Sequence, residues 1–390
     1  GGRGGAAGGA RRSACTAAAA SALVVGVLGG LWVGGWAVWG GLLYGVSPGV
    51  TSALRGRGAG GWSGRAAQGR PVESTRVNAV ATVATGGYAG LQLLDTWVQA
   101  LRHAGGFRGT VFILTDRPDL VTPTRFPGGP VEGVGVEMGA YFPRGLPDYA
   151  PNVLKADLLA LLPPSAERIL FLDLDILVSN HLEPVERNIA SLYTPETAEF
   201  PHAIAGWTDV ICRGLVPYLD PDACMMGSYL NAGAFFVDRR ASGDCMRRWK
   251  EAMVGRDGAP ALVDTLPRDD MVCPAFASCG RDDQYALNHL LRSGDCGSWA
   301  LLSPHYNWGM NSWLVWRALQ KLRLPKKTLS HFTSAARAKI RTVPAYRRRM
   351  TRWLREVGVD TFFDEEGELL QARSLRAGGR GGEEGAARAS

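Results

Sequence analysis

The chain has 390 residues, of which 46% are hydrophobic and 20% charged, and this ordinary globular composition provides enough apolar material for a sizeable core. Its formal net charge is +7 at pH 7. Residues 1–70 hold seven arginines and no acidic residue, so the other 320 residues carry 36 basic side chains and 36 acidic ones. This balance excludes the basic surface of a nucleic-acid-binding domain, and we expect no nucleic-acid partner.

A charge-free apolar segment, residues 22–46, follows an N-terminal leader of residues 1–21. A helix needs about 20 such residues to cross a bilayer. We predict a transmembrane signal anchor there, which would make the chain a single-pass type II membrane protein of the Golgi or another secretory lumen. Its eight glycines weaken a helix, so a signal peptide and a low-complexity stretch stay open as alternatives. Residues 47–75 are predicted to form a flexible stem.

Six of the seven cysteines lie in an 85-residue stretch that runs from Cys212 to Cys296. Their even number is compatible with three disulfides in an oxidising lumen, and their apolar character is equally compatible with simple burial of several of them. No pair has C-x-x-C spacing, so we do not expect structural zinc.

Apolar strand patterns alternate with helical ones in the folded part of the chain. Strands are predicted at Val77–Thr85, Thr110–Thr115 and Arg168–Leu172, and helices at Leu91–His103 and Asn152–Leu162. This alternation predicts an α/β, Rossmann-like fold with a mainly parallel sheet flanked by helices. Ligands of such sheets bind beyond the carboxyl ends of the strands.

Two acidic residues, Asp173 and Asp175, directly follow the predicted strand Arg168–Leu172. Side chains two residues apart on an extended segment point to the same side, so we expect the two carboxylates to converge. No lysine or arginine lies between Arg168 and Arg187, whereas oxygen ligands at a strand end suit Mg²⁺ or Mn²⁺. Alternatively, one of the two aspartates caps the following turn and the other pairs with a distant arginine.

Five blocks of the sequence, taken in order, resemble the GT-A glycosyltransferases, and most closely the glycogenin-like family 8 enzymes and related nucleotide-diphospho-sugar transferases. The blocks are VLKADLLALLPPSAERILFLDLDILVSNHLEPV at 153–185, YLNAGAFFVDRR at 229–240, RDDQYALNHLL at 281–291, HYNWG at 305–309 and LSHFTSAARAK at 329–339. The resemblance implies a GT-A domain over residues 76–341. Beyond it, the basic helical pattern predicts a C-terminal helical extension (342–374), and composition predicts a disordered tail (375–390).

The resemblance implies a metal site and a cationic contact to a diphosphate. Asp173, Asp175 and His331 would hold Mn²⁺ or Mg²⁺, which would bridge the two phosphates of a nucleotide sugar. Arg337 stands where the family has a lysine on the diphosphate, which keeps the charge and changes the geometry. Ser334 replaces the family's glycine, so this late loop departs furthest from the family pattern.

Contacts with the nucleotide, the donor sugar and the acceptor are implied in the same way. Thr85 and Tyr88 would meet the nucleotide, Tyr88 by stacking on the base, and Lys155 would touch the diphosphate or the donor sugar. The implied catalytic residues, which would line the donor sugar and the acceptor face, are Asn231, Asp283 and Gln284. Each of these residue types also has a structural explanation, such as a loop aromatic, a solvated lysine or an acidic helix cap.

We therefore expect a metal-dependent hexosyl- or pentosyltransferase that moves a sugar from a UDP-sugar to a hydroxyl group of a glycan, protein or small-molecule acceptor. The family retains the anomeric configuration, so the resemblance implies a retaining transfer. A sugar nucleotidyltransferase is the alternative enzyme, although the loop TGGYAG at 85–90 lacks the basic residue of a phosphate-binding loop. A non-catalytic, membrane-anchored sugar-binding protein is the alternative of a different class.

Overall fold

The structure is a computed structural model that describes residues 75–86, 92–141, 150–208, 230–255, 261, 283–303, 306–309, 328–332, 337, 340–356 and 358–359. The predicted leader, anchor and stem up to residue 74 lie outside the described residues, as do Tyr88, the tail and four of the six clustered cysteines. Among the helices of the described ranges, none combines the length and the apolar character that crossing a bilayer requires.

Seven strands form the larger sheet. They are β1 (Ala79–Val83), β2 (Thr110–Thr115), β3 (Val131–Gly135), β4 (Arg168–Leu172), β6 (Ile204–Thr208), β7 (Leu230–Asp238) and β8 (Trp299–Leu301). Their order across the sheet is β3-β2-β1-β4-β7-β6-β8, and all of them except β7 run in the same direction. The prediction of an α/β fold with a mainly parallel sheet is confirmed.

The reversed strand β7 brings its first residues to the carboxyl end of β4. Leu172 of β4 pairs with Ala234 of β7. The next residue, Asp173, donates its backbone N–H to the carbonyl oxygen of Gly233 at 2.8 Å. The carboxyl ends of β1, β2 and β4 and the amino end of β7 therefore lie along one edge of the sheet, which we call the site edge.

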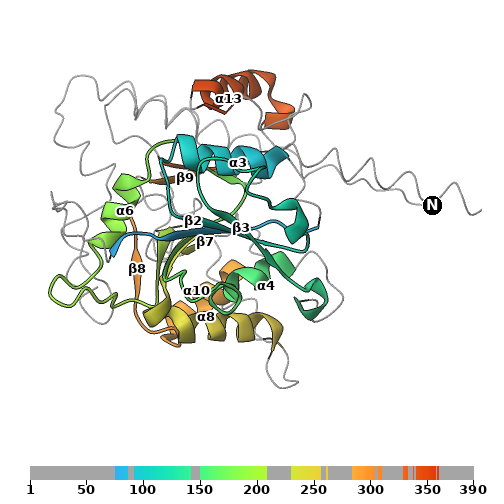
Figure 1. The fold of residues 1–390 in the computed structure, drawn as a ribbon. Coiled ribbons are helices and arrows are strands. Elements are labelled where there is room, and N and C mark those ends of the chain that lie inside the picture. Colours follow the sequence, from blue (N-terminus) through green and yellow to red (C-terminus); the bar gives the residue numbers. More distant parts are fainter. Residues whose placement is uncertain are drawn as a thin grey trace, which may run out of the picture. The chain divides into compact units, whose positions relative to one another are not determined.

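Helices cover both faces of the sheet (Figure 1). One face carries α3 (Gln92–His103), α6 (Glu183–Ala190) and α13 (Pro344–Glu356), and the other carries α4 (Ala150–Ala156), α5 (Leu158–Leu161), α8 (Arg239–Val254) and α10 (Asp283–Ser293). Pro118–Leu120 and Met138–Tyr141 are short 3₁₀ helices. Leu170 and Leu172 of β4 join the first core, whereas Ile169 and Phe171 join the second. Burial on both faces explains the continuous apolar run of this strand.

Three short strands form a second sheet beside the site edge. β10 (Leu329–His331) lies between β5 (Ile176–Val178) and β9 (Asn307–Gly309), antiparallel to β5 and parallel to β9. His331 pairs with Ile176, and Phe332 donates its N–H to the carbonyl oxygen of Asp175 at 2.8 Å. The late histidine segment is thus attached directly to the residues that follow β4.

The observed elements agree with the predicted ones where the apolar pattern is strong. The strands Thr110–Thr115 and Arg168–Leu172 are confirmed to the residue, and α3 ends at the predicted residue, His103. The predicted helix Asn152–Leu162 is instead divided into α4 and α5 at Asp157. The carboxylate of Asp157 there accepts a hydrogen bond from Nζ of Lys250 on α8 at 2.7 Å, a tertiary contact that local periodicity does not reveal.

Candidate functional site

A turn between β4 and β5 carries the two aspartates of the D-x-D triplet. The N–H of Ile176 donates to the carbonyl oxygen of Asp173 at 2.9 Å, which closes this turn. β4 ends at Leu172, so the expectation that Asp173 and Asp175 lie on one extended segment is wrong. The two carboxylates are bound by different cationic side chains.

Lys155 of α4 is the partner of Asp173. Its Nζ lies 2.9 Å from Oδ2 of Asp173 and 2.9 Å from Oδ2 of Asp283, the first residue of α10. Lys155 is 7% exposed and Asp283 is 6% exposed. The side chain of Asp173 is 28% exposed, so Lys155 and Asp283 are the buried pair of this group. Because a buried charge that loses its partner is strongly destabilising, each of these two residues depends on the other at this depth.

Asp175 is compensated by the last residue of β10, His331, and by Arg337 beyond this strand. Its Oδ1 lies 3.6 Å from Nε2 of His331, and its Oδ2 accepts a hydrogen bond from Nη1 of Arg337 at 3.2 Å. Arg337 is 162 positions from Asp175 in the chain, and Lys155 is 18 positions from Asp173. The basic residues missing from the immediate sequence neighbourhood are therefore supplied by the fold.

The charged groups of this network shift one another's pKa values. Burial alone would lower the pKa of Lys155, but the charges of Asp173 and Asp283 outweigh it and raise this pKa above its ordinary value. Burial raises the pKa of Asp173 to about 6, opposed by Lys155 and assisted by the charges of Asp175 and Asp283. Burial would also raise the pKa of Asp175, but His331 and Arg337 hold it below the ordinary value. Asp173 and Asp175 therefore influence each other although their partners differ.

Gly233 of β7 packs against the carboxylate of Asp173. A Cβ at this position would lie 2.8 Å from Oδ2 of Asp173 and 3.0 Å from Oδ1 of Asn231. The N–H of Gly233 donates to the same Asn231 oxygen at 2.8 Å. Close approach of a carboxylate thus explains the glycine in the block at 229–240, and it places Asn231 beside Asp173.

Two amide side chains attach the start of α10 to β7. Oε1 of Gln284 accepts a hydrogen bond from the N–H of Ala232 at 3.1 Å. Asn288 accepts from the N–H of Leu230 at 2.6 Å and donates to the carbonyl oxygen of the same residue at 2.8 Å. Sequence reasoning named Gln284 and missed Asn288, although the spacing of four residues that puts both on one helix face was visible in the block at 281–291.

The carboxyl end of β1 brings Thr85 and Gly86 to the site edge. Thr85 is buried. Gly86 has a φ of +63° and donates its N–H to both carboxylate oxygens of Asp116 at 3.1 Å. Asp116 directly follows β2 and was not predicted, although an acid at a strand end beside a glycine-rich loop was the available signal. The predicted base-stacking residue Tyr88 lies outside the described residues.

The three predicted metal ligands do not form one metal site in the described part of the chain. Asp175 and His331 face each other across 3.6 Å, and within the described ranges the buried Nδ1 of His331 has no hydrogen-bond partner. These two side chains fit a divalent cation as oxygen and nitrogen ligands. Asp173 is bound to Lys155 and would have to exchange this partner. Asp175 and His331 could thus bind Mn²⁺ or Mg²⁺ as they stand, whereas Asp173 could bind the cation only after it leaves Lys155.

Comparisons with known proteins give matches among solved structures alone, since no family model and no curated protein matches the chain. The galactosyltransferase LgtC, in complex with donor and acceptor sugar analogs, matches with a TM-score of 0.46 and 16% identity over 74% of this chain and 98% of LgtC. Mouse xyloside xylosyltransferase 1 matches with a TM-score of 0.43 and 12% identity, over 66% of this chain and 98% of the xylosyltransferase. The glycosyltransferase GlyE of Streptococcus pneumoniae matches with a TM-score of 0.41 and 13% identity, over 66% of this chain and 55% of GlyE. Likeness at these identities and TM-scores assigns no activity to this chain.

Gly233→Ala should lower the free energy of unfolding by about 1–3 kcal/mol, because the new Cβ would push the carboxylate of Asp173 away from Lys155. Gly243→Ala is the matched control. Gly243 lies within α8 with no atom within 4 Å of its would-be Cβ, so alanine there should raise the free energy of unfolding by up to about 1 kcal/mol. Urea unfolding measures both variants, and a neutral effect of Gly233→Ala would contradict the close packing.

Lys155→Met should lower the free energy of unfolding by about 3–5 kcal/mol, because the buried carboxylate of Asp283 and the partly buried one of Asp173 would be left without their cation. Arg187→Met is the control, because it removes an exposed ion pair, that with Glu183 at 2.7 Å, whose side chains are 43% and 61% exposed. This control should cost about 1 kcal/mol or less. If urea unfolding gives equal losses for the two variants, Lys155 does not hold the network together.

Proposed function

We propose that this chain is a glycosyltransferase that moves a hexosyl or pentosyl group from a UDP-sugar to an acceptor hydroxyl. One observation carries the proposal, namely that residues from all five sequence blocks come together at the site edge and the small sheet beside it. They are Lys155 and Asp173 of the first block, Gly233 of the second, Asp283 of the third, Gly309 of the fourth, which pairs with His331, and His331 of the fifth. The stability of an α/β sheet does not require polar side chains to gather at one edge, whereas ligand binding there does.

The charges of the network suit a substrate that arrives with a divalent cation. Three carboxylates, those of Asp173, Asp175 and Asp283, share two permanent cations, Lys155 and Arg337. Apart from His331, the network therefore carries one excess negative charge. A divalent cation would offset this excess and would also balance the charge of a nucleotide diphosphate.

In this proposal the chain's own residues hold and orient the donor. Arg337 binds Asp175 from a partly exposed position, so its guanidinium is placed to meet the diphosphate as well. Lys155 would contact the diphosphate or the donor sugar once Asp173 turns toward a cation. When bound to Asp175, His331 and the released Asp173, Mn²⁺ or Mg²⁺ would stabilise the charge on the departing diphosphate. Asn231, Asp283 and Gln284 would line the donor sugar and the acceptor face.

The cellular setting is part of the same proposal. The predicted anchor at 22–46 would tether the enzyme as a type II membrane protein in the Golgi or another secretory lumen. A disulfide between Cys245 and Cys296 supports an oxidising compartment, in which such bonds persist. The acceptor would be a glycan, a protein or a small molecule that carries a hydroxyl group.

We expect the transfer to retain the anomeric configuration of the donor sugar. Each of the three network carboxylates already binds a cation, which disfavours a double displacement with one of them as nucleophile. Instead, the acceptor oxygen would bond to the anomeric carbon on the face from which the diphosphate leaves, and a diphosphate oxygen would take the hydroxyl proton. Nuclear magnetic resonance of the product gives its anomeric configuration, and an inverted product would contradict this mechanism.

Release of UDP from a panel of UDP-sugars, with and without Mn²⁺, tests the function directly. The purified chain should release UDP in a Mn²⁺-dependent manner, and Asp175→Asn should reduce the rate at least about 100-fold while the urea midpoint shows a preserved fold. Asp119→Asn is the matched control, because Asp119 is an exposed carboxylate paired with Arg117 at 2.9 Å and should leave the rate unchanged.

Two other outcomes identify the alternative classes. Pyrophosphate release from a sugar phosphate and a nucleoside triphosphate, without UDP release, would indicate a nucleotidyltransferase. Sugar binding without binding of UDP or Mn²⁺ would indicate a non-catalytic sugar-binding protein.

A further inference from the structure

The buried indole of Trp249 on α8 holds the first residue of α10. Its Nε1 donates a hydrogen bond to the backbone carbonyl oxygen of Asp283 at 2.8 Å, and Trp249 is 0% exposed. The carboxylate of Asp283 binds Lys155. The indole therefore acts on Lys155 through the backbone and side chain of Asp283.

A series of ring contacts leads from Trp249 back to Lys155. The indole meets Phe235 edge-on with ring centres 5.5 Å apart, and Phe235 stacks on Phe171 at 4.9 Å. Nζ of Lys155 lies 5.8 Å from the centre of the Phe171 ring. With the ion pair between Lys155 and Asp283 and the hydrogen bond from Trp249 to the backbone of Asp283, these contacts link five residues into a closed ring. Because close-packed rings leave little room to adjust, a shift of the indole affects both the partner of the ammonium and the ring beside it.

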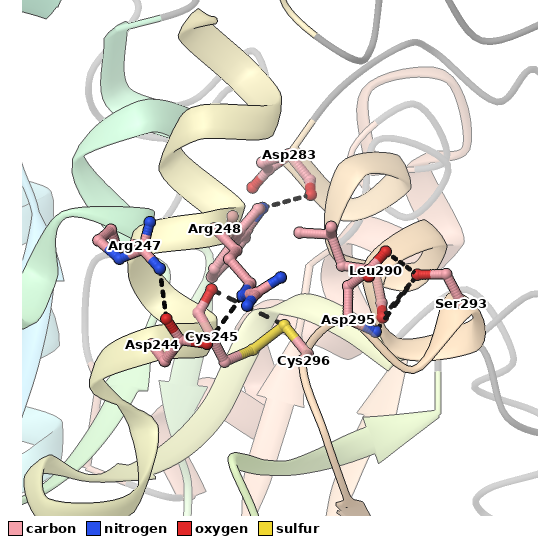
Figure 2. Close-up of a disulfide and its surroundings, with 10 residues drawn as sticks. Asp244, Cys245, Arg247, Arg248, Asp283, Leu290, Ser293, Asp295 and Cys296 are labelled. Carbon is pink, nitrogen blue, oxygen red and sulfur yellow. Dashed lines mark hydrogen bonds and ion pairs between the residues drawn. A yellow bond between two sulfur atoms is a disulfide. The ribbon is translucent and has the colours of Figure 1, made fainter. Parts of the chain in front are cut away.

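A disulfide ties the other end of α10 to the same helix. Cys245 lies four residues before Trp249 on α8 and is bonded to Cys296, three residues beyond the end of α10 (Figure 2). Helix α10 is thus attached to α8 at both ends, by a hydrogen bond at its start and by a covalent bond just past its last residue. On the outside of α8, exposed Arg247 and Arg248 pair with Asp244, and such surface pairs contribute little to stability.

We propose that Trp249 is a positioning residue for the Lys155–Asp283 ion pair, and that the Cys245–Cys296 disulfide completes the attachment of α10 to α8. The proposal rests on the proposed function where catalysis is concerned, since a correctly placed ammonium matters for the transfer of the donor sugar. Its structural part, the coupling of Trp249 to Lys155, stands independently of any activity.

The structural part is tested by a double-mutant cycle with Trp249→Phe and Lys155→Met. Phenylalanine keeps a ring and removes the N–H donor. The change in the unfolding equilibrium constant of the double variant should differ at least about threefold from the product of the two single changes. Trp207→Phe is the matched control, because Trp207 is also 0% exposed and its Nε1 also donates to a backbone carbonyl oxygen, that of Ser303 at 3.0 Å. When Trp207→Phe is combined with Lys155→Met, the change in the unfolding equilibrium constant should equal the product of the two single changes. The same result for Trp249→Phe combined with Lys155→Met would overturn the proposal.

The catalytic part is tested by the kinetics of UDP release. Trp249→Phe should lower kcat and kcat/KM for the donor equally, by about tenfold or more, because it displaces a group that acts in the transition state and leaves nucleotide binding unchanged. Trp207→Phe should change neither value more than about twofold. Equal decreases of kcat and kcat/KM for the two tryptophan variants would show that Trp249 contributes only to packing of the core.

A second variant keeps the test decisive if Trp249→Phe does not fold. Cys245→Ala combined with Cys296→Ala detaches the far end of α10 and should also lower kcat with KM unchanged. An unchanged kcat would overturn the proposal that attachment of α10 to α8 positions the Lys155–Asp283 ion pair. If the wild-type chain releases no UDP from any donor, the proposed function fails. The double-mutant cycle on stability then still decides whether Trp249 positions Lys155.

Discussion

The two ion pairs of Lys155 join three segments of the site that have no local connection, namely α4, the turn after β4 and the start of α10. Taking the ammonium of Lys155 and the carboxylate of Asp283 out of water, and part of the carboxylate of Asp173, is costly, and their attraction offsets that cost only while both distances stay short. Much of the surrounding structure maintains those distances. The carbonyl oxygen of Gly233 accepts from the N–H of Asp173, and the indole of Trp249 donates to the backbone carbonyl oxygen of Asp283.

The reversal of β7 determines which groups can approach Asp173. A strand parallel to β4 would present its carboxyl end at the site edge, but β7 presents its amino end. Its glycine accommodates the carboxylate of Asp173 at a distance that any side chain would disturb. Its first backbone groups, at Leu230 and Ala232, bond to amide side chains of α10. The same short segment therefore admits one acidic group of the network and anchors the helix that carries another.

Sequence patterns predicted the local elements of the fold but not the partners of the charged residues. The strand Arg168–Leu172 could be predicted because burial on both faces leaves a continuous apolar run. The turn at Asp173 could not be predicted, because the same residues are compatible with an extended segment. Lys155 and Asp283 are 128 positions apart, and no periodicity relates residues at such a separation. The family resemblance singled out both residues, yet it did not indicate that they bind each other, and it gave no sign of Trp249 or Asn288.

The two halves of the charged network differ in how firmly the fold holds them, and this difference bears on what a ligand can move. Lys155 and Asp283 are buried, and α10, which begins at Asp283, is tied to α8 by the Cys245–Cys296 disulfide just past its last residue, so displacing them would disturb a core. Asp175, in contrast, is held by a three-residue strand and by Arg337, whose side chain is 31% exposed. A salt bridge to a partly exposed arginine is weak and is easily exchanged for other partners. Under the proposed function, a diphosphate with its cation would therefore rearrange the contacts of Asp175 and Arg337 first, while Lys155 and α10 would keep their positions beside the donor sugar.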